Sequence, residues 1–182
     1  MEKHSILIPN PRFGVLPKTG QQVSYADYDD GYYEQGWKKG RTVANNRTRF
    51  VKKAACSNVI LDYATRLMWS PVDMTCGTTK NWADSLTEVH QQCNLLPYYG
   101  FLDWRMPNIL ELASLLNFED PYEGFVYSDF FANMDSYVYW SSTTRQDSTT
   151  YAHVVRFLGT NTITSTLKTG TGTCRIRVCR SF

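Results

Sequence analysis

The strongest pattern of apolar and polar positions lies in the middle of the chain and predicts an amphipathic helix. Five apolar side chains are separated by four, three, four and three residues, which places them on one helix face: Trp82, Leu86, Val89, Cys93 and Leu96. Asn81 is suited to cap the start of this helix, with Asp84 three residues later as in a capping box. Pro97 ends the helix.

A second helix is predicted to begin at Asn108, which has Glu111 three residues later. Asn117 is suited to its C-cap, and its apolar side consists of Ile109, Leu112, Ala113, Leu115 and Leu116. The following residues, 117–136, are acidic and aromatic. Their carboxylates could hold calcium, but they lack the spacing of a known calcium loop. We therefore expect a solvated face there and no metal site.

Short runs of apolar, β-branched and aromatic residues predict strands at 59–62, 67–69, 137–140, 151–158, 161–167 and 175–180. Because the helices precede most of the strands and do not alternate with them, the expected fold class is α+β, with two helices packed on antiparallel β-sheets. Residues 1–55 have weak periodicity and many turn formers, so we expect an irregular N-terminal arm or hairpin packed on the main body. The main body then occupies residues 56–182.

Length, composition and charge exclude several classes of protein. A chain of 182 residues with 42% hydrophobic residues suits one globular domain with an arm and is unlike disordered or fibrous proteins. No apolar run approaches the roughly 18 residues of a membrane span, and we find no signal peptide at the start. Residues 36–60 contain seven bases and no acid. They could steer an anionic partner or lie against acidic segments, but with only Trp37 and Phe50 for stacking we expect no nucleic-acid binding.

The chain has five cysteines, and their spacing predicts neither zinc nor a redox motif. No CxxC pair is present, and the three histidines lie far apart. We therefore expect no cofactor. An odd number leaves one thiol free even if two disulfides form, and the sequence leaves the pairing open among Cys56, Cys76, Cys93, Cys174 and Cys179.

Hydroxyl side chains are concentrated near the end of the chain, where 15 of residues 141–174 are Ser or Thr. Such side chains suit adaptable recognition because they form hydrogen bonds in several geometries. The alternative is a β-rich surface in which Thr is favoured by strand propensity. We interpret the segment as a binding face whose candidate ligand-binding residues are Arg145, Asp147, Thr149, Tyr151, His153, Arg156, Asn161, Thr162, Thr164, Thr166 and Lys168.

Other motif residues are expected to be structural. Trp is highly buried on average, so we assign Trp69, Trp82, Trp104 and Trp140 to the core, not to sugar stacking. Asp103 and Arg105 could act as an acid and a base, but no nucleophile accompanies them, and we expect an ion pair between them.

Several stretches in fixed order resemble a known family. They are Leu67-Met68-Trp69, Asn81-Trp82-Ala83-Asp84-Ser85-Leu86, Cys93-Asn94-Leu95, Asp103-Trp104-Arg105-Met106-Pro107-Asn108 with Glu111-Leu112, Tyr139-Trp140-Ser141-Ser142-Thr143, Gly159 and Arg177-Val178-Cys179-Arg180. Together they resemble the Lcl C-terminal domain family, named after a bacterial collagen-like adhesin. The lead-in Leu16-Pro17-Lys18-Thr19-Gly20-Gln21 and Asp29-Asp30-Gly31 is also similar, so the resemblance covers roughly residues 16–180.

This resemblance implies a C-type-lectin-like fold related to formylglycine-generating enzymes. The family's best-known member binds sulfated glycans, and related lectin-fold domains are variable ligand binders diversified by retroelements. Two positions depart from the family pattern. The usual Arg-Cys-Val-Arg ending has its middle residues exchanged here as Val178 and Cys179, which turns the thiol to the other face of the strand and argues against a disulfide from Cys93 to the last strand. His153 stands where the family commonly has an aromatic residue.

Taken together, these observations predict a non-enzymatic recognition domain. The expected partner is an extracellular glycan, sulfated or not, or a protein receptor, met at a cell or virion surface. Two alternatives are a cysteine oxidase similar to the formylglycine-generating enzymes and a homo-oligomeric cap that trimerises a fibre.

Overall fold

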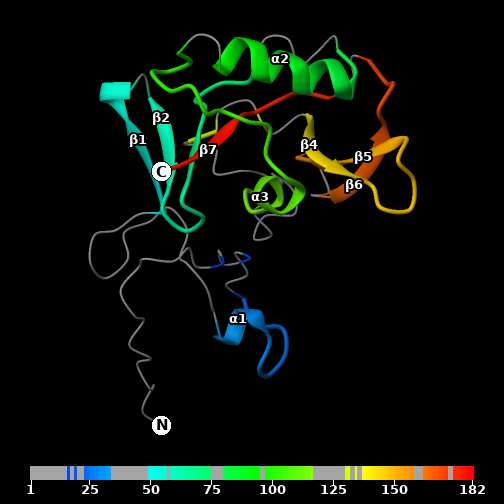
Figure 1. Cartoon of the computed structure of the whole chain (residues 1–182). Helices are drawn as coiled ribbons and strands as arrows, with labels where there is room; N and C mark the ends of the chain where they lie inside the picture. The colour runs from blue at the N-terminus through cyan, green and yellow to red at the C-terminus, as the bar shows by residue number, and fades with distance from the viewer. Residues whose placement is uncertain are drawn as a thin grey trace.

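The computed structural model describes residues 16, 19, 23–33, 49–56, 58–74, 80–94, 97–116, 130–131, 134, 137–157, 162–171 and 174–182. Within these residues the chain forms two antiparallel β-sheets and few helices (Figure 1). The predicted α+β class, with two helices packed on antiparallel sheets, is confirmed. No helix in these ranges is both long and apolar enough to cross a membrane.

The first sheet has the strand order β1-β2-β3-β7. Its strands are β1 (Phe50–Lys53), β2 (Val59–Asp62), β3 (Leu67–Trp69) and β7 (Cys179–Ser181), and a 3-10 helix, η1 (Ala54–Cys56), follows β1. Every residue of β2 and β3 is buried, because both faces of these strands are covered. β1 lies inside the range that we assigned to the arm, so that range contributes a strand to this sheet. The division at residue 55 stays a prediction.

The second sheet has three strands in the order β4-β5-β6, namely β4 (Val138–Thr144), β5 (Tyr151–Arg156) and β6 (Thr162–Leu167). Its β4 edge is joined to the segment before β7. There the amide of Trp140 donates to the carbonyl of Arg175 at 3.0 Å, and the Arg175 amide donates to Val138 at 2.8 Å. This segment follows β4 before it enters the first sheet, which explains why β7 begins at Cys179 and not at residue 175 as predicted.

Two helices, α2 (Trp82–Asn94) and α3 (Ile109–Ala113), cover opposite faces of the sheets (Figure 1). We call the hydrophobic cluster that contains Val89 and Cys93 of α2 the α2-side cluster; it includes Val59, Leu61, Met68, Trp104, Trp140, Ala152, Val154, Cys174 and Val178. We call the cluster that contains Leu112 of α3 the α3-side cluster; it includes Phe50, Ile60, Leu67, Trp69, Tyr139, Val155, Phe157 and Cys179. Neighbouring core residues of β2, β3, β4 and β5 enter different clusters, as the two-residue period of a strand requires.

The helix starts follow the sequence prediction, but the end of α3 does not. The amide of Asp84 donates to Asn81 Oδ1 at 2.9 Å, and a complete capping box joins Asn108 and Glu111. The C-cap is Ser114, so the prediction of Asn117 was wrong. After the cap the chain tightens into bonds between residues three apart, such as Leu115 N–H to Leu112 at 3.1 Å, which end the α-helix while both leucines stay buried.

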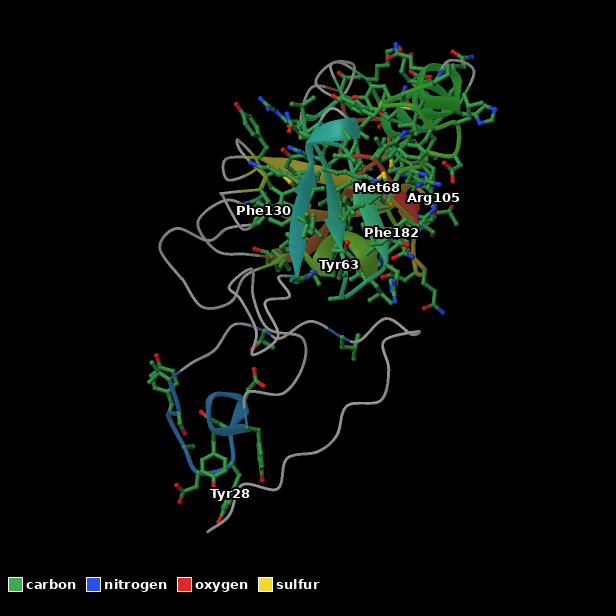
Figure 2. The ribbon with its side chains drawn as sticks, turned by 90° about the vertical axis from the view of Figure 1, so that its left-hand side faces the viewer. Tyr28, Tyr63, Met68, Arg105, Phe130 and Phe182 are labelled. Carbon is green, nitrogen blue, oxygen red and sulfur yellow. The ribbon has the colours of Figure 1, made fainter. Side chains whose placement is uncertain are left out.

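The assignment of the motif tryptophans to the core is confirmed for three of them. Trp69, Trp104 and Trp140 are fully buried, whereas Trp82 is half-buried at the start of α2. In the first sheet, the ring of Phe182, which follows β7, packs edge-to-face on Tyr63, which follows β2, with 5.6 Å between the ring centroids (Figure 2).

The short helix α1 (Asp30–Tyr33) belongs to the lead-in segment. Its Gly31 is buried, and an added Cβ would lie 2.2 Å from the carbonyl oxygen of Val23, so the close approach of the two backbones requires glycine. The carboxylate of Asp29 accepts the backbone N–H of Tyr25 at 2.8 Å and that of Tyr32 at 2.9 Å. These bonds, led by that from Tyr25, lower the pKa of Asp29 to about 2.

Candidate functional site

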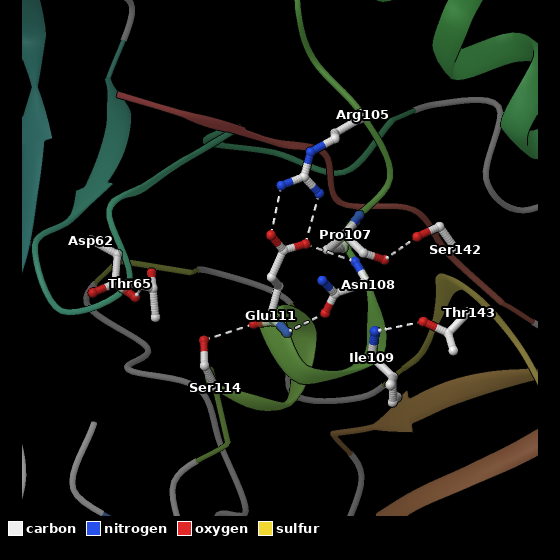
Figure 3. Close-up of polar contacts among 10 residues, drawn as sticks. All are labelled: Asp62, Thr65, Arg105, Pro107, Asn108, Ile109, Glu111, Ser114, Ser142 and Thr143. Atoms are coloured by element: carbon white, nitrogen blue, oxygen red, sulfur yellow. Dashed lines mark hydrogen bonds and ion pairs between the residues drawn. The ribbon is translucent and has the colours of Figure 1, made fainter. Parts of the chain in front are cut away.

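The first hydroxyls of the Ser/Thr-rich segment hold the scaffold together. Thr143 Oγ1 accepts the N–H of Ile109 at 3.0 Å, and the Ser142 hydroxyl donates to the Pro107 carbonyl at 3.3 Å (Figure 3). The buried Ser141 hydroxyl donates to the carbonyl of His153 at 2.7 Å. One of the free N–H groups at the start of α3 is thus satisfied by β4. The hydroxyls of Ser142 and Thr143 therefore join β4 to the start of α3, and the hydroxyl of Ser141 joins β4 to β5.

An ion pair fixes the approach to α3. Both terminal nitrogens of Arg105 donate to the carboxylate of Glu111, at 2.7 and 2.6 Å, and the same carboxylate accepts the Asn108 amide at 2.8 Å (Figure 3). Burial raises the pKa of Glu111, but the hydrogen bonds from Arg105 and Asn108 outweigh it and hold that pKa below its ordinary value.

The expected pairing of Asp103 with Arg105 was wrong. Backbone bonds of 2.9 Å in both directions join Arg105 to Cys179, which brings the neighbouring Arg180 beside Asp103. Arg180 donates to the two carboxylate oxygens of Asp103 at 2.5 and 3.0 Å. Asp103 therefore joins the last strand to the segment before α3.

Five side chains on the α3 side of the second sheet form what we call the hairpin cluster: Arg145, Asp147, Tyr151, His153 and Ser165. Arg145 follows β4 and donates to both oxygens of Asp147, at 2.5 and 2.6 Å. Its guanidinium carbon lies 5.6 Å from the ring centroid of Tyr151, and Nη1 lies 3.4 Å from Ser165 Oγ. His153 is opposite Ser165 in the sheet register and is half-buried.

The charges of the hairpin cluster compensate each other. The hydrogen bond from Arg145 lowers the pKa of Asp147, and the nearby His153 acts in the same direction. The carboxylate in turn raises the pKa of Arg145. The arrangement is a half-buried aromatic ring beside a guanidinium–carboxylate pair and the Ser165 hydroxyl. It can accept and donate hydrogen bonds but holds little net charge.

The structure divides the candidate ligand-binding residues between two faces of the sheet. Arg145, Asp147, Tyr151 and His153 lie together on the α3 side, and Thr149 is exposed in the turn between β4 and β5. Thr164 and Thr166 lie on the α2 side, because they are opposite Val154 and Ala152 of the α2-side cluster. Arg156 and Thr162, which are opposite each other, lie on the same side because every second residue of a strand shares a face. Asn161 lies outside the described residues.

Lys168 completes the α2-side face. Its ammonium lies 4.1 Å from the ring centroid of Trp82 and donates to Thr144 Oγ1 at 2.7 Å. The Trp82 indole in turn donates to the carbonyl of Ser141 at 2.8 Å. Lys168 is therefore held against the scaffold, which leaves Arg156 as the exposed base among the candidates on that face.

A comparison with protein families agrees with this architecture. The model of the Lcl C-terminal domain matches residues 58–180, which is more than half of the chain. The chain belongs to the Lcl C-terminal domain family. No curated protein matches the chain. The match begins after the lead-in, so the resemblance of residues 16–31 stays a prediction.

The exchanged residues at the end of this Lcl C-terminal domain have the structural consequence expected from the sequence. Val178 enters the α2-side cluster and Cys179 enters the α3-side cluster, whereas Cys93 and Cys174 both lie in the α2-side cluster. Cys179 is thus separated from Cys93 by the sheet. Burial raises the pKa of Cys179 to about 12, so it is protonated at neutral pH.

The Lcl C-terminal domain also contains a charged network that the sequence did not predict. The carboxylate of Asp73 accepts the Tyr139 hydroxyl at 2.7 Å and lies 3.2 Å from Arg175 Nη1 and 2.7 Å from Arg177 Nη2. It connects the segment after β3 with β4 and the end of the chain. Tyr139 and Arg177 carried a signal as members of family motifs, but their pairing with Asp73 did not, because the partners of Asp73 are far away in the sequence.

No group of three or more His, Cys, Asp or Glu side chains in the described part of the chain is arranged to hold a metal ion. Two residues of the site were not among the candidate ligand-binding residues. Ser165 was one of many hydroxyls, and Trp82 was assigned to the core, whereas its ring also supports Lys168.

Proposed function

We propose that this Lcl C-terminal domain is a non-enzymatic recognition domain that presents the hairpin cluster to an external glycan or protein receptor. The single observation that carries the proposal is that the two parts of the Ser/Thr-rich segment differ in their contacts. Ser141, Ser142 and Thr143 are bonded within the scaffold, while the residues after them form a partly exposed set of adaptable polar groups around Tyr151. A rigid scaffold that carries a variable polar loop is a general solution for binding.

The residue types of the hairpin cluster suit both ligand classes. The Tyr151 ring offers an amphipathic surface with few rotatable bonds, and the guanidinium–carboxylate pair with the Ser165 hydroxyl offers directed hydrogen bonds. A sulfated glycan would compete with Asp147 for Arg145, since sulfate and carboxylate bind the guanidinium in the same way. The exposed Arg156 would add positive charge from the other face.

The proposal also takes three features from the family resemblance: a C-type-lectin-like fold, a location at a surface, and diversification by a retroelement. Two helices on two antiparallel sheets are compatible with a C-type-lectin-like fold, and recognition of an external ligand implies a cell or virion surface. Exposed hydroxyls such as Thr149, Thr162 and Thr164, beside motif residues that are bonded internally, are consistent with a variable protein diversified by a retroelement.

The cysteine oxidase alternative is less well supported. It would use an accessible thiol pair of lowered pKa, and Cys174 and Cys179, five residues apart, are the nearest pair of cysteines in the sequence. Both are buried, and the pKa of Cys179 is raised, not lowered. The recognition function is therefore the better account of these residues.

The proposal is tested by probing the purified chain on an array of neutral and sulfated glycans and on intact cells. Tyr151→Ala removes the ring of the hairpin cluster and should abolish retention, whereas Thr164→Ala, on the opposite face of the same sheet, should bind like the wild type. Binding that Tyr151→Ala leaves unchanged, or an absence of binding to every glycan and cell tested, would contradict the proposal.

A further inference from the structure

Strand β6 is an open edge of the second sheet, and its sequence lacks the usual protection against pairing. It ends the order β4-β5-β6, and no other described strand pairs with its outer side. Exposed edges in natural proteins are commonly protected by charged residues, proline, bulges or short length. Residues 162–167 contain no charged residue and no proline. Five of these six residues are Thr, Ser or Ile, which favour strands or tolerate them.

The other sheet edges differ from β6 in this respect. β1 has the exposed lysines Lys52 and Lys53, and β7 is three residues long and contains Arg180. The β4 edge is contacted by the segment around Arg175. Among the described edges, β6 is therefore the one suited to accept another strand.

The register shows which backbone groups of β6 point outward. The amide of Lys168 donates to the carbonyl of Thr150 at 2.9 Å, one step beyond the pair of Tyr151 with Leu167. Hydrogen-bonded and non-bonded pairs alternate in an antiparallel ladder, so Thr166, Thr164 and Thr162 bond to β5. The N–H and C=O groups of Ile163, Ser165 and Leu167 consequently point away from β5. The Leu167 carbonyl accepts the Gly170 amide at 3.1 Å and keeps a second lone pair.

We propose that β6 pairs with β6 of a second copy of this chain, antiparallel and centred on Ser165. The two copies are related by a twofold axis perpendicular to the sheet, so the α3 sides of both copies lie on one face of the joined sheet and the α2 sides on the other. In this register Ser165 lies opposite itself, and Ile163 lies opposite Leu167 of the second copy. These are the three residues whose backbone groups point outward, so each forms a hydrogen-bonded pair.

The side chains favour the same register. Ile163 and Leu167 are 49% and 46% exposed, and they lie on one face of the strand on either side of Ser165. Self-pairing centred on Ser165 brings them into contact across the axis twice and removes apolar surface from water. On the opposite face Thr164 meets Thr166, a pair without charge. A register centred on Thr164 would instead place Ile163 opposite Ser165 and would form fewer outward pairs.

The dimer does not depend on the proposed function, but it would bring two hairpin clusters together. Arg145 contacts Ser165, and Ser165 lies next to the twofold axis of the dimer. The hairpin clusters of the two copies would therefore lie on either side of that axis. The two three-stranded sheets would become one six-stranded sheet.

The test is sedimentation of the full chain over a concentration series, with variants at the edge. Ser165→Pro removes an N–H that points away from β5, so it spares the ladder within the chain and blocks the central pair. Each substitution is present in both copies, so it affects the interface twice. Ser165→Pro and Ile163→Lys should each raise the dissociation constant of the dimer by about tenfold or more. Ser165→Ala, which keeps the N–H, should dimerise like the wild type.

Leu110→Lys is the matched control for Ile163→Lys, because Leu110 is exposed on α3, away from the edge. It should not change the association. A wild-type chain that stays monomeric up to its solubility limit would overturn the proposal. So would a dimer that Ile163→Lys and Ser165→Pro leave as strong as before, or one that Ser165→Ala weakens as much as Ser165→Pro. If Ser165→Pro does not fold, the comparison of Ile163→Lys with Leu110→Lys decides.

Discussion

Replacing Arg49 by alanine tests how much the buried ion pair between Arg49 and Asp62 contributes to the stability of the fold. The side chains of Arg49 and Asp62 are both fully buried. Arg49 donates from Nε and Nη2 to the two carboxylate oxygens of Asp62, at 2.9 and 2.7 Å, and from Nη2 to the carbonyl of Ser114 at 2.9 Å. Asp62 also accepts the Ala64 amide at 3.0 Å and the Thr65 hydroxyl at 2.8 Å. One guanidinium thus joins the residue before β1, the end of β2 and the end of α3.

The expected loss follows from the burial of both charges. Arg49→Ala leaves the Asp62 carboxylate in the interior without its counter-ion, and breaking a buried pair in this way costs about 3–5 kcal/mol. The Ser114 carbonyl loses a donor as well, which belongs to the same order of effect. Domains of this kind unfold with about 5–15 kcal/mol in total, so the variant should lose a large part of its stability.

Urea unfolding of the full chain, followed by tryptophan fluorescence, measures this loss. Lys53→Ala is the control, because Lys53 is an exposed base in the same strand, and such surface changes usually stay within about 0.5 kcal/mol. A free energy of unfolding for Arg49→Ala within about 1 kcal/mol of the wild type would refute the reasoning, since the pair would then contribute no more than an exposed one.

Three further predictions concern the scaffold and the hairpin cluster. The pKa of Glu111 lies below its ordinary value of 4.5 in the folded state, so its interactions stabilise the fold above about that pH and are lost as the pH falls through the folded-state pKa. The advantage of wild type over Glu111→Gln in thermal unfolding should therefore shrink as the pH is lowered below 4.5, and an advantage independent of pH would contradict this. Thr143→Val removes the acceptor of the Ile109 amide and should cost about 1 kcal/mol in urea unfolding, against little change for Thr149→Val in the exposed turn; equal effects would show that the bond is unimportant. Asp147→Asn releases Arg145 and should strengthen retention on heparin at low salt, whereas Arg145→Gln should weaken it, and identical elution of the two variants would remove Arg145 from any anion site.

Local patterns predicted the elements whose residues interact with near neighbours in the sequence. The capping box of Asn108 and Glu111 spans three residues, and the bounds of β2 and β3 follow from apolar runs between turn residues. β6 was predicted within a residue of its start. β1 was missed because only Phe50 is buried in it, so the strand shows neither an apolar run nor an alternating pattern.

The polar contacts of the scaffold could not be predicted, because their partners are far apart in the sequence. Asp73 meets Arg175, 102 residues later, and Asp103 meets Arg180, 77 residues later. For the candidate site, the sequence predicted which residues are polar but not which face each one joins. Alternation separates Thr164 from Ser165, and only the packing of α2 and α3 determines which side each face meets.

The affinity of wild type and Tyr151→Ala for one glycan or receptor recovered from the array, measured by titration calorimetry, tests recognition by the hairpin cluster most directly. We predict that the wild type binds, that Tyr151→Ala raises the Kd by about tenfold or more, and that Thr164→Ala leaves the Kd within about twofold. An equal Kd for wild type and Tyr151→Ala would place the binding surface elsewhere on the molecule and contradict the account.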